Sequence, residues 1–292
     1  LTSIETKHLI HKGFEPKNIK NPYIYEMWQK NKFKLGEHIT SIDAAFYIVP
    51  MVNAVQRSGT IEEKELLFKS MLKYEAFEVI PSTKRGCKGQ TERLVEQAVR
   101  MSTNVKNRQT RAQDASMEYL ENRIEKENMM DRKVLLFTLE PGKVDKNIAG
   151  LIANKISAKY QRPSCMLTKV GDVYQGSARG YEMSGVTNFK DICDETGCVN
   201  WTAGHQNAFG ISINADRIEE FLEKTDIALA NMASEPVYYV DYIYNGADVN
   251  PQDILAISDL SDLWGKDMDE AMVAVKDIKI SKELVVVYRK TS

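Results

Sequence analysis

The chain has 292 residues, of which 43% are hydrophobic and 27% are charged, and its formal net charge is -2. These fractions are typical of a water-soluble globular protein long enough for two domains, and a net charge so close to zero does not by itself indicate a nucleic-acid partner. No apolar run is as long as a transmembrane helix and no signal peptide opens the sequence, so we expect a cytoplasmic protein that binds no membrane.

Two further features concern the cysteines and the first residues. Only one pair of cysteines is close together, in "CDETGC" (193–198), and no second pair stands at metal-ligand spacing. We therefore expect free thiols and no zinc site at the four cysteines, which are Cys87, Cys165, Cys193 and Cys198. The sequence opens at Leu1 inside an amphipathic helical pattern, so we expect further residues upstream.

The first 80 residues have the apolar spacing of α-helices. Hydrophobic positions recur every three or four residues in "IDAAFYIVPMVNAVQ" (42–56) and in "EEKELLFKSMLKYEAF" (62–77). Pro50 lies within the first stretch and should interrupt it, because proline has no N–H to donate. The composition of "PSTKRGCKG" (81–89) then predicts a loop.

A stretch without glycine or proline runs from Thr91 to about Asn128 and predicts one long helix, capped by Thr91. At 1.5 Å per residue it would be about 55 Å long. Its apolar stripe is narrow and rich in alanine, which favours a connector between two bodies over the alternative of a coiled-coil partner. The predicted stripe consists of Leu94, Ala98, Met101, Val105, Ala112, Ala115 and Tyr119, with Arg108 occupying one turn.

Basic residues gather between Lys84 and Arg111, whereas residues 248–270 are mostly acidic. A local basic face on a nearly neutral protein is what contact with phosphates requires. We therefore expect Arg100 and Arg108 to lie along the path of a nucleic acid. A solvated helix face is the alternative interpretation of the same residues.

Residues 132–232 alternate between strand and helix patterns, which predicts a small α/β domain. "RKVLLFTLE" (132–140) and "RPSCMLTKV" (162–170) have the apolar runs of buried strands, and "NIAGLIANKISAKY" (147–160) between them has the spacing of a helix. A further helix is predicted at 215–232. After Pro236, two strand-like runs at 237–245 and 282–290 predict a β-rich tail.

Two stretches of this α/β domain could hold a ligand. "QGSARGYEMSG" (175–185) combines small residues, which permit a tight loop, with Arg179, whose guanidinium suits a phosphate or a carboxylate. "WTAGHQNAFGISI" (201–213) places His205 on the rim of a small-residue turn, just before a half-buried strand. A histidine there can donate to a phosphate or a base, although a loop-capping histidine and a solvated arginine remain the structural alternatives.

Three motifs and one further strand stretch, in the same order as in the family, carry a resemblance to a known family. "GSARG" (176–180) followed by "AGHQNAFGISI" (203–213) resembles the "GSGRS … GGHxxAAG" pair of the DHH-associated domain. "PMVNAVQRSG" (50–59) resembles the "PRxNAAGRxG" segment between the two domains of RecJ-type single-strand exonucleases, and "YQRPSCML" (160–167) resembles "YGRPVIVL" in the same family. The similarity extends over about residues 1–280.

The resemblance implies which residues contact the substrate. Residues of the arginine stretch would bind a substrate phosphate, and residues of the histidine turn would contact the same strand. The matching residues of the interdomain segment would also belong to the substrate-binding site. They are, in that order, Gly176, Ser177 and Arg179, Gly204 and His205, and Asn53 and Arg57.

Three departures from the family pattern bear on substrate selectivity. Met51 stands where the family usually has an arginine, Asp145 where it has a histidine, and Ala203 where it has a glycine. Loss of the arginine removes one potential phosphate contact.

The family's hydrolytic chemistry depends on aspartates and histidines of an N-terminal domain, including an Asp-His-His signature, which bind two Mn²⁺ or Mg²⁺ ions. No Asp-His-His occurs in this sequence, and His8, His11 and His38 do not form one. The resemblance therefore implies that this chain has no catalytic residue and no metal ligand of its own.

The fold class that we expect is α/β, in four parts. Residues 1–89 would be the helical remainder of the catalytic DHH domain, and residues 90–130 the long connecting helix. Residues 131–234 would form the DHH-associated α/β substrate-binding domain. Residues 235–292 would be a β-rich tail that begins an oligonucleotide-binding barrel.

The function that the resemblance implies is that of the C-terminal portion of a monomeric 5′→3′ exonuclease acting on single-stranded DNA in repair and recombination. Two alternatives stay open: a DHH-family phosphodiesterase for dinucleotides or short oligonucleotides, and a non-catalytic single-strand-binding accessory module. The strand-rich tail argues against the phosphodiesterase, because small-substrate relatives usually end near the histidine turn.

Overall fold

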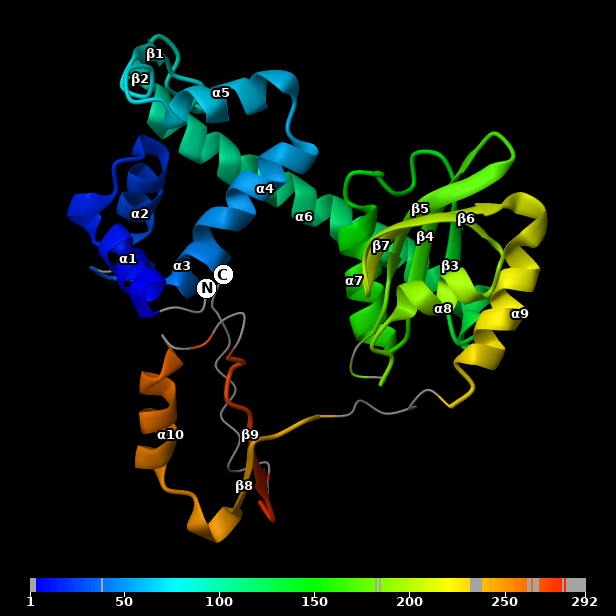
Figure 1. The fold of residues 1–292 in the computed structure, drawn as a ribbon. Coiled ribbons are helices and arrows are strands. Elements are labelled where there is room, and N and C mark those ends of the chain that lie inside the picture. The colour runs from blue at the N-terminus through cyan, green and yellow to red at the C-terminus, as the bar shows by residue number, and fades with distance from the viewer. Residues whose placement is uncertain are drawn as a thin grey trace. The chain divides into compact units, whose positions relative to one another are not determined.

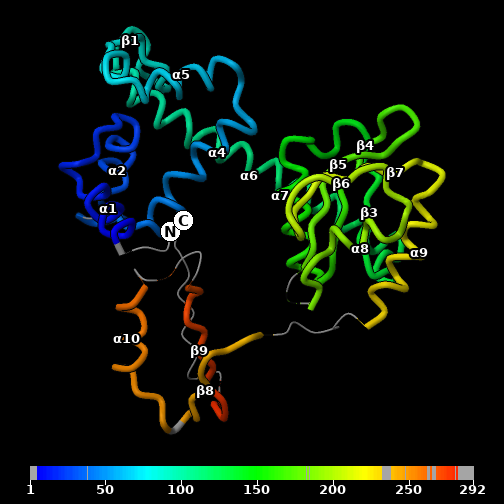
Figure 2. Tube along the Cα trace, in the orientation of Figure 1, coloured from blue at the N-terminus to red at the C-terminus, as the bar shows by residue number. Residues whose placement is uncertain are grey.

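The computed structural model describes residues 4–37, 39–181, 183, 185–231, 238–261, 264, 268–279 and 281. The chain divides into two compact units, a larger one of residues 14–237 and a smaller one of residues 1–13 and 238–292. Figure 1 labels the elements of both units, and Figure 2 follows the course of the chain through them.

The helical part of the larger unit is built around α6 (Leu94–Lys126). Three helices pack on its first half, namely α2 (Pro22–Leu35), α4 (Val49–Ser58) and α5 (Ile61–Met71) (Figure 1). Both α2 and α5 start at a side-chain cap, since Asn21 and Thr60 each accept a hydrogen bond from an amide of the first turn. The buried side chains of this part form one hydrophobic cluster, which includes Tyr23, Trp28, Leu67, Val95 and Val105.

The predicted interruption at Pro50 is only a change of helix type, because residues 41–58 stay helical throughout. The short helix α3 (Ser41–Asp43) passes into a π-helical turn, η2 (Ala44–Ile48), and α4 then begins with Pro50 in its first turn. Proline is tolerated at that position because the first N–H groups of a helix have no partner within the helix. A 3₁₀ turn, η1 (Pro16–Asn18), precedes α2.

A short antiparallel hairpin precedes α6 and corrects the predicted cap. Its strands are β1 (Val79–Pro81) and β2 (Thr91–Arg93), with Thr91 paired to Pro81. Thr91 is therefore in a strand, and the residue that caps α6 is Arg93, whose amide donates to the Glu96 carboxylate at 3.0 Å. The prediction was wrong because strand pairing with a distant segment decided the conformation of Thr91.

The predicted long helix is confirmed in α6, whose 33 residues are unbroken and span about 50 Å. Its first half packs in the helical cluster, and Leu120 and Ile124 near its end pack in a second cluster with the sheet, so the helix joins two cores. The predicted stripe is wrong in the middle of the helix. There the alanines at 112 and 115 are exposed, and the buried side chains are Gln109, Gln113 and Ser116.

The second part of the larger unit is a five-stranded sheet in the order β3-β4-β5-β7-β6. β3 (Leu135–Leu139) and β4 (Ser164–Val170) are parallel, with α7 (Ala149–Tyr160) between them in sequence, as predicted. The remaining pairs are antiparallel, and their strands are β5 (Val173–Arg179), β6 (Val199–His205) and β7 (Ala208–Asn214).

Helices cover both faces of this sheet (Figure 1). α7 and the end of α6 pack on one face, in the cluster that contains Phe137 and Met166. α8 (Phe189–Glu195) and α9 (Ile218–Ala228) pack on the other, in the cluster that contains Phe209 and Ile211. The 3₁₀ turns η3 (Met129–Asp131) and η5 (Ala215–Arg217) lead into β3 and α9. The expected α/β fold is thus confirmed.

The predicted arginine loop is a strand. Gly176, Ser177 and Arg179 all lie in β5, which pairs along its whole length with β4 and β7. A Cβ at Gly176 would collide with the carbonyl oxygen of Met166 on β4, so the glycine is needed for strand pairing. The prediction was wrong because small residues that permit a loop also permit close approach of a neighbouring strand.

The smaller unit contains α1 (Ile4–Phe14) as far as residue 13, and a β–α–β arrangement. β8 (Tyr242–Asn245) and β9 (Val273–Lys276) pair in parallel, with η6 (Gly246–Asp248) and α10 (Pro251–Asp259) between them in sequence. The predicted β-rich tail is therefore partly helical, and the expected strand at 282–290 lies outside the described residues. The oligonucleotide-binding barrel and the four domain boundaries stay predictions.

Within the described ranges, no helix combines the length and the apolar character that crossing a membrane requires.

Candidate functional site

The centre of the candidate site is Arg179, the last residue of β5. Its guanidinium packs against the start of α7, where a Cβ on Gly150 would lie 2.5 Å from the arginine Nη2. Nη1 donates to the carbonyl oxygen of Ala178 at 2.7 Å, whereas the buried Nε has no hydrogen-bond partner in the described part of the chain. Because Nε is enclosed by protein atoms, a ligand can reach this partly exposed guanidinium only through its outer nitrogens.

Positive charge accumulates around this guanidinium. Partial burial lowers the pKa of Arg179, and repulsion by Arg57 of α4 lowers it further. Among the residues that the structure describes, no carboxylate forms an ion pair with either arginine. The N-terminal end of α7 adds the positive end of a helix dipole. An anion with several oxygen acceptors, such as a phosphate, matches these donors.

The Ser177 hydroxyl lies beside the same point. Its Oγ is 3.5 Å from the position that a Cβ on Gly150 would take. Ser177 and Arg179 are two residues apart on one strand, so both side chains point to the face covered by α7. Gly150 was missed by the sequence prediction, although an isolated glycine inside a helical pattern is a signal of close packing or function.

Arg179 and His205 are brought together through β7. Ala208 of β7 pairs in register with Arg179 on one side and with His205 on the other. Neighbouring strands are about 4.8 Å apart, so the two Cα atoms are about 10 Å apart and the side chains share a face. Gly204 has a φ of 138°, and a Cβ there would lie 2.7 Å from the Ala208 carbonyl oxygen, so only glycine fits this hairpin.

Asn207, in the turn between β6 and β7, fixes the hairpin to the end of β5. Its carbonyl oxygen accepts from the Gly180 amide at 3.0 Å. Its side-chain oxygen accepts from the Phe189 amide at 3.1 Å, and its side-chain nitrogen donates to the Thr187 carbonyl oxygen at 3.0 Å. The sequence prediction missed this residue, although an asparagine between two strands is a turn signal.

A groove of about 490 Å³ lies next to the hairpin, a size typical of ligand sites. It is bounded by α7, by the segment that follows β5 and by the turn after β6. Its lining includes Asn154, Ser157, Gly180, Tyr181, His205 and Asn207. Ser177 and Arg179 are not part of this lining, so the groove is separate from the anion site, although Gly180, the residue after Arg179, borders it.

Asn53 and Arg57 are exposed and lie one helical turn apart on α4. Arg57 is linked to the anion site by its electrostatic effect on Arg179. In the described ranges no hydrogen bond or ion pair joins Asn53 to Ser177, Arg179 or His205. The structure thus brings the strand and hairpin residues together with Arg57 and does not bring Asn53 to them.

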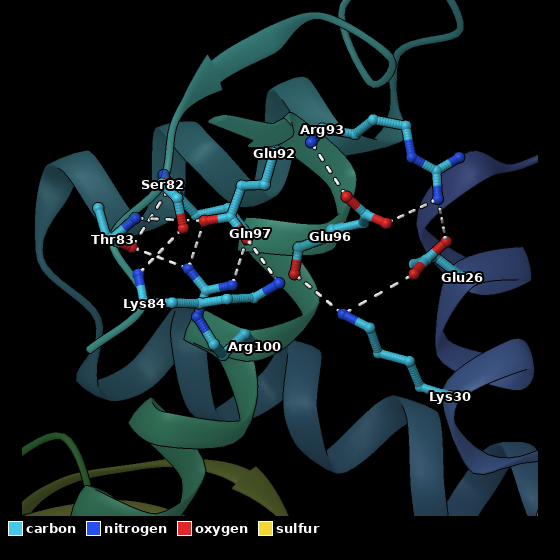
Figure 3. Close-up of polar contacts among 10 residues, drawn as sticks. All are labelled: Glu26, Lys30, Ser82, Thr83, Lys84, Glu92, Arg93, Glu96, Gln97 and Arg100. Carbon is cyan, nitrogen blue, oxygen red and sulfur yellow. Dashed lines mark hydrogen bonds and ion pairs between the residues drawn. The ribbon is translucent and has the colours of Figure 1, made fainter. Parts of the chain in front are cut away.

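Arg100 and Arg108 have carboxylate partners inside the protein. Arg100 donates to both oxygens of Glu92, at 2.5 and 2.6 Å, within the polar network of Figure 3. These bonds lower the pKa of Glu92 to about 2. Arg108 donates to Glu63 of α5 at 2.7 Å. The pairs tie the β1–β2 hairpin and α5 to α6, and a position of both arginines on a nucleic-acid path stays a prediction.

Among the residues that the structure describes, no group of three or more His, Cys, Asp or Glu side chains is arranged to hold a metal ion. The chain's own described residues therefore do not fit a metal centre. All four cysteines are free, and burial raises the pKa of Cys165 to about 12.

Comparison with curated proteins finds two relatives with the same alignment. The chain is 30% identical over 294 residues to YorK of Bacillus subtilis (strain 168), which is named as a candidate SPbeta prophage-derived single-strand DNA-specific exonuclease, and to its counterpart in Bacillus phage SPbeta. The alignment covers 97% of this chain and 49% of each relative. The chain thus spans about half the length of the curated relatives it matches. No family model matches it.

Among solved structures, RecJ from Thermus thermophilus has the same fold. Its complex with Mn²⁺ superposes with a TM-score of 0.56 over 89% of this chain and 36% of RecJ, at 14% sequence identity. Its complex with Mg²⁺ gives a TM-score of 0.53 over 88% of this chain and 37% of RecJ, also at 14% identity. With the motif residues now located on β5 and on the β6–β7 hairpin, the chain is similar in sequence to the YorK proteins and has the fold of part of RecJ.

Proposed function

We propose that this chain is the substrate-binding C-terminal portion of a RecJ-like exonuclease that degrades single-stranded DNA from its 5′ end. The observation that supports this best is the half-buried guanidinium of Arg179, which has no carboxylate partner among the described residues and has Ser177 and the start of α7 beside it. In this role, Arg179 and Ser177 bind a backbone phosphate, and His205 contacts a neighbouring group of the same strand.

The residues of this chain bind and orient the strand, and none of them breaks a bond. Phosphodiester hydrolysis would belong to an N-terminal DHH domain whose aspartates and histidines hold two Mn²⁺ or Mg²⁺ ions. The greater length of the curated relatives is compatible with such a domain. A guanidinium and a hydroxyl on a phosphate read no sequence, which suits an enzyme that degrades any single strand.

The direct test is binding of a 5′-phosphorylated oligothymidylate by the purified chain. Arg179→Ala should weaken binding about 30-fold, because truncating one partner of a desolvated charged contact costs about 2 kcal/mol. A matched control is Arg217→Ala, since Arg217 lies outside the site and pairs with Glu220 at 3.0 Å. Unchanged affinity in Arg179→Ala, with the same thermal melting temperature as the wild type, would contradict the proposal.

Two further measurements separate the exonuclease from the alternatives. Affinity that increases from a dinucleotide to long oligonucleotides favours the exonuclease over a phosphodiesterase for dinucleotides. An Asp-His-His motif encoded upstream of Leu1 in the same reading frame favours the exonuclease over a non-catalytic accessory module, and an initiator codon close to Leu1 favours the module.

A further inference from the structure

The edge strand β6 contains a β-bulge that places Trp201 on the opposite face of the sheet from Val199. Val199 pairs with Ile213, and Trp201 pairs with the next residue, Ser212, so Asn200 is the additional residue. In a regular strand, residues two apart share a face. The bulge breaks this alternation, and Trp201 leaves the face covered by α8 and α9.

The face that Trp201 joins is the face of the candidate site. Three rows of residues cross β5, β7 and β6 in register, and none of them contains a carboxylate. The β7 member of each row is small. The rows are Arg179–Ala208–His205, Ser177–Gly210–Ala203 and Gln175–Ser212–Trp201. Hydrogen-bond donors therefore lie along β5 and two ring side chains lie along β6, with small residues between them.

The position of the Trp201 ring leaves it available to a ligand. The ring lies over Gly210, where a Cβ would be 3.1 Å from the ring atom Cζ3. The tryptophan is nevertheless 45% exposed, and its neighbour Ala203 is exposed as well. A large aromatic side chain that rests on a glycine and is open to solvent is suited to stacking rather than to filling a core.

We propose that Trp201 stacks on a nucleobase of the single strand whose phosphate Arg179 binds. The inference rests on the proposed function and adds to it a base-binding position. Trp201 and His205 are four positions apart on β6, which is about 13 Å of extended β-strand, so the stacked base belongs to a nucleotide farther along the DNA strand than the group that His205 contacts. Every base has a flat aromatic face, so this contact adds affinity without sequence preference.

The test compares two single strands of equal length, an oligothymidylate and an abasic strand with the same phosphates. Trp201→Ala should lower the affinity for the oligothymidylate about tenfold, the loss expected for one stacked base, and leave the affinity for the abasic strand unchanged. Trp201→Phe retains a ring and should recover most of the loss. The oligothymidylate should also quench the tryptophan fluorescence of the wild type more than that of Trp201→Phe.

A second variant tests the position of the ring without removing it. Gly210→Ala introduces a methyl group 3.1 Å from the indole, which must shift, so the preference for thymidylate over the abasic strand should decrease. This variant keeps the test valid even if Trp201→Ala does not fold. If the Trp201 variants lose the same affinity for both strands, the inference is overturned. The ring would then affect binding of the phosphates and would not stack on a base.

Arg179→Ala distinguishes this inference from the proposed function. This substitution should lower the affinity for both strands by the same factor, since both strands contain the phosphate. If Arg179→Ala changes neither affinity, the proposed function fails. If it weakens both strands while Trp201→Ala preserves the wild-type ratio between them, only the stacking inference is wrong.

Discussion

Arg179 and His205 lie on opposite sides of Ala208, each paired with it in register across neighbouring strands. Their side chains share one face of the sheet, about 10 Å apart at the Cα atoms. Asn207 ties the hairpin to the residue after Arg179, so this separation is set by backbone hydrogen bonds. At that spacing we expect the two side chains to contact different groups of one strand.

Arg179→Ala and His205→Ala should each weaken binding of a 5′-phosphorylated single strand, and the two effects should add. Substitutions about 10 Å apart without a shared partner are additive to within about 0.5 kcal/mol. Fluorescence anisotropy of a labelled strand with the wild type, both single variants and the double variant measures the coupling energy. A coupling above about 1 kcal/mol would show that both side chains hold the same phosphate.

Gly150→Ala should weaken strand binding without lowering the melting temperature. The added Cβ would lie 2.5 Å from Nη2 of Arg179, so the guanidinium must move. Alanine is also the better helix residue, by up to about 1 kcal/mol. Gly13→Ala in α1 is the matched control, because nothing lies within 4 Å of its added Cβ. If Gly150→Ala binds the strand with wild-type affinity, strand binding does not depend on the position of the Arg179 guanidinium.

Glu92 should make the stability of the helical part depend on pH. Its bonds to Arg100 lower its pKa from 4.5 to about 2, and its side chain is only 3% exposed. A carboxyl group with a lowered folded-state pKa stabilises the fold above pH 4.5, and the stabilisation is lost as the pH falls towards 2. The shift corresponds to about 3 kcal/mol.

Urea denaturation at neutral and acidic pH measures this contribution. Glu92→Gln should lower the free energy of unfolding by about 3 kcal/mol at pH near 7, and the difference from the wild type should shrink in acid. Glu118→Gln is the control, because Glu118 is exposed and forms no ion pair within the described residues. If Glu92→Gln lowers the free energy of unfolding by the same amount at both pH values, the ion pair between Glu92 and Arg100 is not the source of that loss.

Arg100 and Arg108 are predicted to contact the nucleic acid although both are paired within the fold. Charge reversal at either position should weaken single-strand binding, and Arg108→Gln should reduce the slope of log K against log salt by about 0.7 if one phosphate contact is lost. Glu63→Gln breaks the same ion pair but keeps the cation, so it should not reduce the slope. A slope that Arg108→Gln leaves unchanged would assign Arg108 a purely structural role.

Local sequence patterns predicted the elements that depend on local interactions. The absence of glycine and proline predicted α6, and apolar spacing predicted β3, α7 and β4 in the right order. Predictions failed where a partner distant in sequence decided the outcome. Thr91 pairs with Pro81 instead of capping the helix, and Gln109 is buried because its side chain donates to Ser58 at 3.0 Å.

The sequence by itself determined which residue types stand at the candidate site, namely an arginine and a serine in one motif and a histidine after glycine in another. Only the tertiary structure decided how they are arranged. The pairing of β7 with both β5 and β6 places Arg179 and His205 on one face, and a bulge brings Trp201 to that face. The physical reason is that both features depend on segments that are separate in the sequence. The strand register is fixed when the sheet forms, and the contact of Gly150 with Arg179 is fixed when α7 packs on that sheet.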